Sequence, residues 1–567
     1  MRGIAGETMK RIVISVLFLS SLTPRFVLAQ GFMPQTVGTS PIRAFDPTID
    51  SVERSWVVVY RGDDSTDVET RGYAIATDAQ GFIYVVGSAD SDYVTIKYNP
   101  SGDLLWSARY NGPGNSLDRA SSVAIDDSGD VIVTGFSWDS VNSVDYATVC
   151  YTSIGTQRWV ARYDGSGHSY DFATDMALDP AGNIYVTGFS RDSSSPLYDF
   201  VTIKYDRWGI VQWISRYDGI GHATDHAWSI GLDSAGNVYV AGQSNSGHSF
   251  DYATVKYNSM GAEQWVTRYN GPENSEDHAW ALAVDVSGNS YVTGGSGESP
   301  NYDMLTVKYN SAGVQQWTAR YDGPMNWDDY GQAVKCDRSG NVYVTGYSVG
   351  VGPRAEFATI KYDRDGTQSW LTRFHAPGST HDVPVDMVVD DASSLYVVGY
   401  SDSGDNVNYS IVKYDSAGYQ AWMASYDGQL SGSDSPTAIT LDMDGNVFVT
   451  GSSMMVGGPH ITTLKYLQLL TTVESVPTLP AEFDLGNNYP NPFNSSTRIS
   501  YSIPGTTHVS MTVYDLTGRL VSMLTEGVHY PGIYSVEFDG SSLGTGTYIV
   551  KLSGNRRTEV RLMLLVR

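Results

Sequence analysis

Short runs of alternating apolar and polar residues follow one another from residue 55 to residue 467, separated by turns rich in glycine and aspartate. β-branched and aromatic residues dominate these runs, which is typical of β-strands with one face in a core. Four kinds of run recur in a fixed order. The first ends in aspartate, the second follows an Asp-x-x-Gly-Asn turn as in 182–188, the third is β-branched as in 252–257, and the fourth contains a tryptophan as in 310–321.

The aspartate that ends each first run marks the period of the pattern. It is Asp78, Asp126, Asp179, Asp233, Asp285, Asp337, Asp390 and Asp442. The intervals between these residues are 48, 53, 54, 52, 52, 53 and 52, so the repeating unit is close to 52 residues. Four antiparallel strands at such a period are typical of the blades of a β-propeller.

The order of the runs also predicts how the array closes. The array begins with a tryptophan run at 56–60 and ends with a run of the third kind at 461–466. The last unit therefore lacks its fourth strand, and the first tryptophan strand is left over. Pairing the two gives an all-β, eight-bladed propeller over residues 55–467, closed by its N-terminal strand, and removes the exposed sheet edges of an open array.

These eight copies resemble the SBBP family of secreted bacterial β-propeller repeats, and the resemblance covers residues 55–467. It implies a propeller of an extracellular bacterial protein. The ligands of that family are mostly unassigned, so the resemblance implies a fold and a location rather than a ligand.

The N-terminus has the layout of a secretory signal peptide, predicted at residues 1–29 and followed by a linker at 30–54. Arg2, Lys10 and Arg11 precede the apolar run 12–19, and Ala29 ends the predicted segment. A buried N-terminal strand is the alternative. The apolar run is too short to span a bilayer, and no other segment approaches about 20 apolar residues, so we do not expect an integral membrane protein.

The C-terminal residues 483–567 follow a linker at 468–482 and alternate like a small β-sandwich. The motifs at 488–494, 513–519, 546–548 and 562–567 resemble the type A C-terminal sorting domain of the type IX secretion system, and the immunoglobulin-like domain of flagellar hook-capping proteins. This resemblance implies contact with the type IX machinery and export through the periplasm and across the outer membrane to the cell surface or the exterior. One departure is that Glu559, Val560 and Arg561 replace the family's paired lysines. A plain adhesive sandwich is the alternative.

The amino-acid composition limits the kinds of molecule that the protein is expected to bind. The formal net charge is −26, which opposes binding to nucleic-acid phosphates and favours cations or neutral ligands. Cys150 and Cys336 fall at different strand positions of different repeats, so we expect two small buried apolar side chains rather than a disulfide.

Rows of tryptophan, lysine and arginine are expected to join neighbouring blades through ring packing, cation–π contacts and ion pairs. The tryptophans are Trp56, Trp106, Trp159, Trp213, Trp265, Trp317, Trp370 and Trp422. The lysines are Lys97, Lys204, Lys256, Lys308, Lys361, Lys413 and Lys465, and the arginines are Arg109, Arg162, Arg216, Arg268, Arg320 and Arg373.

A further aspartate opens the first strand of seven units. These residues are Asp118, Asp171, Asp225, Asp277, Asp329, Asp382 and Asp434. If this strand lies nearest the axis, the carboxylates ring one mouth of the channel and would hold a hard cation such as Ca²⁺, the one cofactor we consider. The alternative is that each aspartate accepts backbone N–H bonds in its own turn.

Symmetry breaks in two neighbouring units, which carry His222, Asp225, His226 and Trp228 in one copy and Asp277, His278 and Trp280 in the next. Imidazole, carboxylate and indole groups near one entrance suit the binding of a sugar face or of a metal ion. Loop variation without a ligand is the alternative.

The sequence therefore predicts a secreted or surface-displayed binding or scaffold protein with a glycan or a surface protein as ligand. The alternative is a secreted enzyme, either a polysaccharide-cleaving hydrolase or lyase or a quinone-dependent dehydrogenase. The tryptophan turns are similar to those of eight-bladed quinoprotein dehydrogenases. However, no adjacent cysteine pair or single departing repeat marks a quinone pocket, and the many equivalent aspartates do not single out a catalytic pair of carboxylates.

Overall fold

A computed structural model divides the chain into two compact units, residues 1–471 and 472–567. The structure describes residues 51–62, 70–139, 143–191, 197–271, 274–298, 301–350, 354–402, 404, 406–430, 432–469, 483–488, 490–505, 507–529, 532–554 and 557–566. The predicted signal peptide at 1–29 and most of both predicted linkers lie outside these residues. In the part of the chain that the structure describes, no helix is long and apolar enough to cross a membrane.

The first unit is a ring of four-stranded antiparallel sheets. Blade 1 consists of β2 (Arg71–Thr77), β3 (Ile83–Ala89), β4 (Asp92–Tyr98) and β5 (Leu104–Tyr110), and blade 2 of β6 (Asp118–Ile125), β7 (Val131–Trp138), β8 (Val144–Tyr151) and β9 (Gln157–Tyr163). Blade 3 consists of β10 (Asp171–Leu178), β11 (Ile184–Arg191), β12 (Tyr198–Tyr205) and β13 (Val211–Tyr217), and blade 4 of β14 (Asp225–Leu232), β15 (Val238–Asn245), β16 (Phe250–Tyr257) and β17 (Glu263–Tyr269). Blade 5 consists of β18 (Glu276–Val284), β19 (Ser290–Glu298), β20 (Asn301–Tyr309) and β21 (Gln315–Tyr321), and blade 6 of β22 (Asp329–Cys336), β23 (Val342–Val349), β24 (Ala355–Tyr362) and β25 (Gln368–Phe374). Blade 7 consists of β26 (His381–Val389), β27 (Leu395–Asp402), β28 (Val407–Tyr414) and β29 (Gln420–Tyr426), and blade 8 of β30 (Ser435–Leu441), β31 (Val447–Met455), β32 (Gly458–Leu469) and β1 (Ser51–Tyr60).

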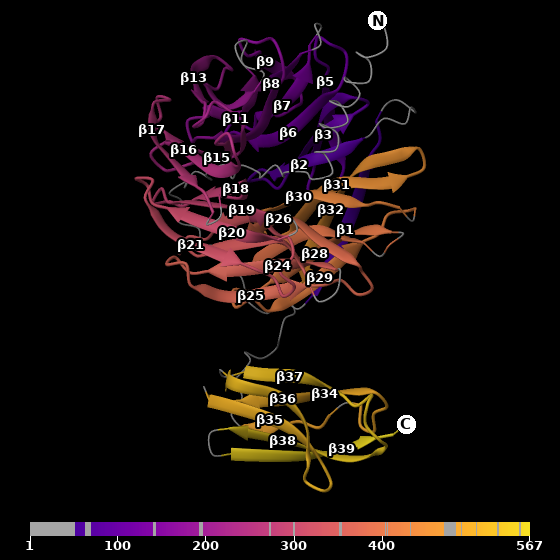
Figure 1. The fold of residues 1–567 in the computed structure, drawn as a ribbon. Helices are drawn as coiled ribbons and strands as arrows, with labels where there is room; N and C mark the ends of the chain where they lie inside the picture. The colour runs from indigo at the N-terminus through magenta and orange to yellow at the C-terminus, as the bar shows by residue number, and fades with distance from the viewer. Residues whose placement is uncertain are drawn as a thin grey trace, which may run out of the picture. The chain divides into compact units, whose positions relative to one another are not determined.

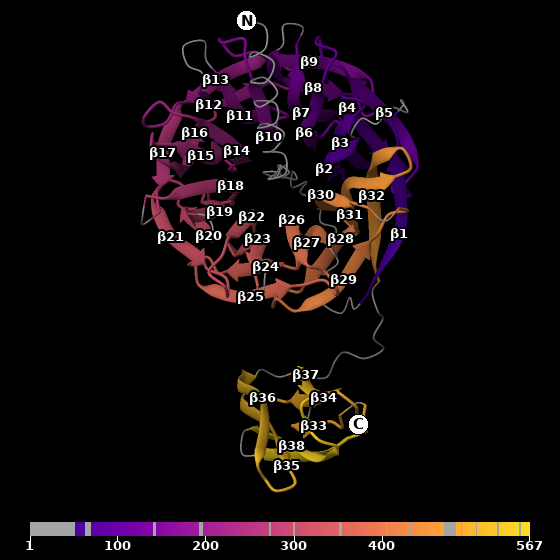
Figure 2. The same ribbon diagram turned by 45° about the vertical axis from the view of Figure 1, so that its right-hand side comes forward.

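The eight blades form a closed ring, as predicted. Six of them are separate four-stranded sheets, and blades 6 and 7 are joined into one eight-stranded sheet by a single parallel pair, Ala355 with His381. The first strand of each blade lies nearest the axis and the tryptophan strand lies outermost (Figures 1 and 2). β1 pairs antiparallel with β32, with Trp56 opposite Lys465, so the N-terminal strand completes the last blade. This strand begins at Ser51 rather than at the expected residue 55.

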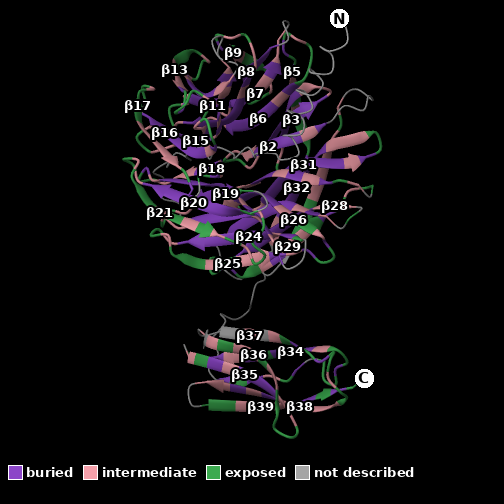
Figure 3. Ribbon diagram, in the orientation of Figure 1, coloured by how far each residue is buried: buried purple, intermediate pink, exposed green. Residues whose placement is uncertain are grey.

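Burial follows the position of each strand in its blade (Figure 3). The second and third strands are buried on both faces, as in β8, whose residues are all buried. The outer strands alternate between exposed and half-buried residues, as in β21. Sheets stacked around an axis bury the two faces of their middle strands against both neighbours, so the core consists of one apolar layer between each pair of blades.

The repeated aspartate turns close the hairpins between first and second strands. In blade 3, Asp179 Oδ1 accepts hydrogen bonds from the backbone N–H groups of Ala181 and Asn183, both at 2.9 Å. Gly182 has φ +79° there, a conformation that favours glycine. The turn therefore uses a glycine at positive φ, and the strand-ending aspartates serve as turn residues.

Seven of the eight repeated tryptophans are held by the turn of the next blade. Trp317 Nε1 donates to the Arg364 carbonyl at 3.2 Å, and the indole lies against Gly366 of that turn. The same bond joins Trp56 to Pro100, Trp106 to Ser153, Trp159 to Arg207, Trp213 to Ser259, Trp265 to Ser311 and Trp370 to Ser416. This confirms the expectation of packing between blades.

The closing blade cannot repeat this bond, because its outer strand comes from the other end of the chain and no turn links it to β32. The Trp422 indole N–H is buried without an acceptor. Lys413, whose counterparts donate to turn carbonyls, instead donates to Gln468 Oε1 at 2.7 Å. A side-chain amide near the end of β32 thus replaces the missing turn for the lysine but not for the tryptophan.

Lysine and arginine rows also join the blades, as expected. Lys361 lies over the Tyr343 ring at 5.1 Å and donates to the Ser416 carbonyl of the next blade at 3.1 Å. Arg162 donates to Asp145 of its own blade at 2.7 Å and to the hydroxyl of Tyr110 in the preceding blade at 2.8 Å. Cys150 takes the lysine position in blade 2. Both cysteines are free thiols, Cys150 buried and Cys336 half-buried.

The second unit is the predicted β-sandwich. One sheet has the order β33 (Asp484–Leu485), β34 (Ser496–Ile503), β37 (Gly532–Asp539), and the other has the order β36 (Leu520–His529), β35 (Thr507–Asp515), β38 (Gly546–Gly554), β39 (Arg557–Leu565). Alternate residues of the strands, among them Ile499, Met511, Val550 and Met563, fill one core between the sheets.

Candidate functional site

A continuous set of ring contacts runs through blades 3 to 6, between residues near the starts of the inner strands and residues of the second and third strands. Its members come from neighbouring blades and are half-buried, apart from the buried Tyr302. We call this set the aromatic band; it comprises Phe172, Phe189, Tyr198, His226, Trp228, Phe250, His278, Trp280, Tyr302, Tyr330 and Tyr347. Figure 2 shows β10, β14, β18 and β22, the inner strands of these blades, side by side around the axis.

Two tryptophans lie at the centre of the aromatic band. Trp228 and Trp280 occupy the same position of β14 and β18, at a β-bulge in each inner strand, and their ring centroids are 5.8 Å apart. Three other blades have a small hydroxyl residue there, Ser121, Thr174 or Thr437, that bonds the next blade. Thr174 Oγ1, for example, donates to the Ala227 carbonyl at 3.0 Å. At Trp228 and Trp280 the bond that these hydroxyl residues make to the next blade is therefore replaced by half-buried aromatic side chains.

Two histidines and a glutamine flank the tryptophans. His278 Nδ1 lies 2.8 Å from Gln243 Oε1, and Gln243 Nε2 lies 3.4 Å from His226 Nδ1. An amide oxygen only accepts, so His278 carries its proton on Nδ1. The amide nitrogen of Gln243 donates to His226 Nδ1, so His226 carries its proton on Nε2. Burial lowers the pKa of His278 to about 4, and burial followed by the proximity of His278 lowers the pKa of His226 to about 4. Both imidazoles are neutral at pH 7.

The structure places the other three residues of this predicted site elsewhere. His222 has a side chain that is 85% exposed, and its Nδ1 lies 2.6 Å from Asp218 Oδ2 in the same turn. Asp225 and Asp277 are buried and accept hydrogen bonds from the backbone N–H groups of Gly219 and Gly271, both at 2.6 Å. The residues that come together are His226, Trp228, His278 and Trp280.

The ring of aspartates has the same local bonding in every blade that carries it. Each carboxylate accepts a backbone N–H from the turn that precedes it, at 2.5 to 3.3 Å: Asp118, Asp171, Asp225, Asp277, Asp329, Asp382 and Asp434. Burial raises the pKa of Asp171, Asp225 and Asp329 to about 6 despite these bonds. A cation held by several of the seven stays a prediction.

Three of these aspartates lie in acidic clusters at the junctions between blades. Each cluster combines one of them with two acids of the preceding blade, with ligand atoms within 4.8 Å of one another: Asp145, Asp164 and Asp171; Asp199, Asp218 and Asp225; Asp303, Asp322 and Asp329. Among the described residues, no such cluster joins two members of the ring. An arginine pairs with the third-strand acid of each cluster, so the clusters are partly neutralised.

Two buried carboxylates at equivalent positions of β10 and β26, Asp175 and Asp386, were not predicted. Asp175 of β10 accepts hydrogen bonds from Met176 N at 2.8 Å and from Ile230 N of the next blade at 3.1 Å. Burial raises its pKa to about 7, opposed by those bonds and by the positive charge of Lys335. The sequence signal was an aspartate at a position where most blades have alanine or serine, including Ser122 and Ser229.

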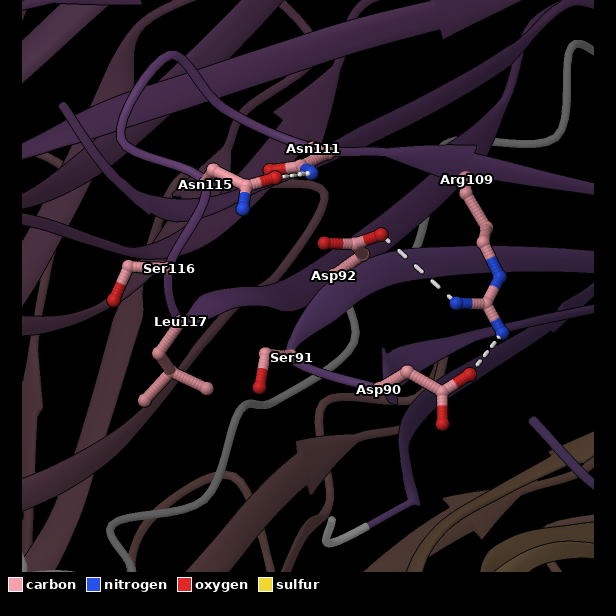
Figure 4. A pocket seen from close by; sticks show the side chains of 8 residues that line it. All are labelled: Asp90, Ser91, Asp92, Arg109, Asn111, Asn115, Ser116 and Leu117. Carbon is pink, nitrogen blue, oxygen red and sulfur yellow. Dashed lines mark hydrogen bonds and ion pairs between the residues drawn. The ribbon is translucent and has the colours of Figure 1, made fainter. Parts of the chain in front are cut away.

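The structure also contains a cavity that sequence reasoning missed, of about 710 Å³ at the junction of blades 1 and 2 (Figure 4). It is lined by Asp90, Ser91, Asp92, Arg109, Asn111, Asn115, Ser116 and Leu117. We call this cavity the blade-1 notch. Its signal in the sequence was the first interval of 48 residues, shorter than all the others.

The fold defines a class: a β-propeller of repeated blades followed by a C-terminal sandwich. Residues 487–565 match the family model of the secretion system C-terminal sorting domain, and residues 159–190 and 213–248 match the SBBP beta-propeller repeat. The chain thus carries SBBP repeats and a type IX sorting domain, which directs secretion across the outer membrane to the surface or the exterior and implies contact with the type IX machinery.

Other similarities are weaker. A WD repeat-containing protein of Acanthamoeba polyphaga mimivirus, L264, is 22% identical over 60% of this chain, which spans only 34% of that protein. Sqt1 from Chaetomium thermophilum is 10% identical with a TM-score of 0.47, covering 75% of this chain and 100% of that chain. A protein of unknown function from Bacteroides caccae is 13% identical with a TM-score of 0.31, covering 52% and 93% of the two chains. None of these similarities transfers a ligand.

Proposed function

We propose that the propeller is a binding protein of the cell exterior that takes up a neutral glycan on the aromatic band. The observation that carries this proposal is the pair Trp228 and Trp280, half-buried and 5.8 Å apart at equivalent positions of neighbouring blades. Aromatic faces of this kind suit the apolar C–H face of a sugar ring. The sorting domain would deliver the propeller to the place where such glycans occur.

The polar groups beside the two indoles support a neutral ligand. His226 and His278 are uncharged at pH 7, and the hydrogen-bonded row through Gln243 fixes which ring nitrogen donates and which accepts. A hydroxyl-rich ligand needs donors and acceptors in fixed places but no counter-charge. The Glu276 carboxylate lies 3.9 Å from His278 Nε2 and adds one acceptor near the band.

A glycan array probed with the full mature chain tests this proposal, followed by calorimetry with the glycan that binds best. Trp228→Ala and Trp280→Ala should each weaken binding at least tenfold. Trp208→Ala is the matched control, because Trp208 is 60% exposed in a turn outside the aromatic band. Equal binding by all three variants would contradict the proposal.

The same experiment separates the other functions. Binding only to surface proteins, with no glycan bound, would favour a protein ligand instead. Release of new reducing or unsaturated ends from a bound polysaccharide would indicate a hydrolase or a lyase.

A further inference from the structure

The hairpin between β3 and β4 is the shortest of its kind in the propeller. Two residues, Asp90 and Ser91, separate Ala89 from Asp92, which faces it across the hairpin. In the other blades six to eight residues separate the equivalent pair, as between Ser137 and Asp145 or between Ser244 and Asp251. Asp90 and Ser91 have φ of +51° and +71°, as a two-residue turn requires. The missing residues leave the blade-1 notch open.

The short turn also changes an ion pair that five other blades share. There the arginine of the outer strand donates to the acid that opens the third strand: Arg162 to Asp145, Arg216 to Asp199, Arg268 to Asp251, Arg320 to Asp303 and Arg373 to Glu356. In blade 1 the corresponding Arg109 donates to Asp90 instead. Its Nη1 lies 3.9 Å from Asp92 Oδ2, too far for a hydrogen bond (Figure 4).

Asp92 therefore keeps only a loose ion pair with Arg109, without the hydrogen bond that its counterparts receive from their arginines. Its side chain is 18% exposed and borders the notch. Burial and the nearby Asp118 carboxylate raise its pKa, and Arg109 opposes this shift only in part. Asn111, Asn115 and Ser116 provide further oxygen acceptors on the cavity wall.

We propose that the blade-1 notch binds a guanidinium or primary ammonium group, which occupies at Asp92 the place that an internal arginine occupies in five other blades. The repeats supply the template for the geometry: Arg268 Nη2 donates to Asp251 at 2.8 Å and Arg373 Nε to Glu356 at 2.7 Å. A planar guanidinium matches a carboxylate in this way, and the net charge of −26 attracts cations to the protein. The site is separate from the aromatic band and does not depend on a glycan ligand.

Two probes distinguish a free small cation from a side chain on a peptide: agmatine, and a short peptide with one central arginine. Calorimetry with the full mature chain should show binding of at least one probe. The same peptide with citrulline in place of arginine should bind at least tenfold more weakly. Binding of both probes means that the cationic group suffices, and binding of the peptide alone means that the ligand is carried by a protein. Both results support the site.

Variants then locate the site. Asp92→Asn should weaken binding at least tenfold with an unchanged melting temperature, since it removes an under-compensated charge. Asp90→Asn leaves Asp92 intact but releases Arg109 to pair with it as in the other blades, so it should produce the same loss. Asp103→Asn is the control, because Asp103 is exposed in the turn that follows β4. No binding by the wild type, equal binding of the citrulline peptide, or unchanged binding by Asp92→Asn would each overturn the proposal.

Discussion

Substituting Trp317 and Gly366 separately and together tests whether the turn of one blade holds the tryptophan of the blade before it. Trp317 donates to the Arg364 carbonyl at 3.2 Å, and its ring lies between Tyr291 of its own blade and Tyr362 of the next, at 6.0 and 5.9 Å. Gly366 has φ +87°, and a Cβ there would lie 2.6 Å from the indole Cγ. The two residues should therefore be coupled energetically.

The expected magnitudes follow from this geometry. A buried tryptophan removes about 150–250 Å² from water, and half-burial at about 25 cal/mol per Å² gives roughly 2–3 kcal/mol. The indole hydrogen bond adds about 1 kcal/mol, so Trp317→Ala should lower the free energy of unfolding by about 3–4 kcal/mol. Gly366→Ala should cost about 1–2 kcal/mol for its positive φ and about 1–3 kcal/mol for displacing the indole.

The double variant should lose only the first part of the Gly366→Ala cost, because no indole remains to be displaced. We thus expect a coupling free energy of about 1–3 kcal/mol between the two sites, measured by urea unfolding of all four proteins followed by circular dichroism. Trp208→Ala, in an exposed turn, should change stability by less than about 0.5 kcal/mol. Additivity of the Trp317 and Gly366 substitutions within about 0.5 kcal/mol would refute the docking argument.

Four further predictions concern the arginine row, pH, calcium and export. Arg268→Ala, which leaves the buried Asp251 without its partner, should lower the free energy of unfolding by about 3 kcal/mol, and Arg268→Lys should recover less than half of that loss. The pKa of Asp175 is raised to about 7, so the native state binds more protons than the unfolded chain between about pH 4 and 7. Stability should therefore fall as pH rises through this window, by up to about 1.4 kcal/mol per pH unit. Asp175→Asn should make the dependence of stability on pH flatter. Calcium should raise the melting temperature if the aspartate ring holds a cation, and an unchanged value in excess Ca²⁺ would remove that hypothesis. Met563→Asp, in the core of the sorting domain, should leave the protein in the periplasm of a type IX-competent host, and surface display of this variant would contradict the assigned role.

The ring and its closure could be predicted because the same pattern of residues recurs in eight repeats. Each unit repeats an aspartate that organises a turn, a glycine at positive φ and a tryptophan. A wrong strand assignment in one unit is therefore corrected by comparison with the other units. The unmatched strand at 56–60 predicted the closing pair, and the structure adds only that this strand begins at Ser51. Trp422 could not be predicted to lack an acceptor, because its sequence context equals that of the other tryptophans.

The site was predicted in part. His226, Trp228, His278 and Trp280 came to attention as departures from the repeat, and they do lie together. His222 shared their composition but lies on the turn, where its φ of +49° and its contact with Asp218 give it a local role. Gln243 was missed because it belongs to β15: the pairing of β15 with β14 places it opposite His226, and the packing of blade 5 against blade 4 brings it to His278.

Both candidate sites arise where a contact of the repeat is missing: a bond between blades at Trp228 and Trp280, and a hydrogen-bonded ion pair within one blade at Asp92. Trp228 and Trp280 stand where Ser121, Thr174 and Thr437 bond the next blade, and Arg109 has left the acid that its counterparts hold. In a ring whose blades each contact two neighbours, one lost contact lowers stability locally while the other junctions maintain closure. The stability lost at such a position can be offset by a ligand that binds there, because binding to the native state adds its own free energy to the stability. That reasoning directs attention to the positions where the repeat is broken, rather than to the carboxylates that every blade shares.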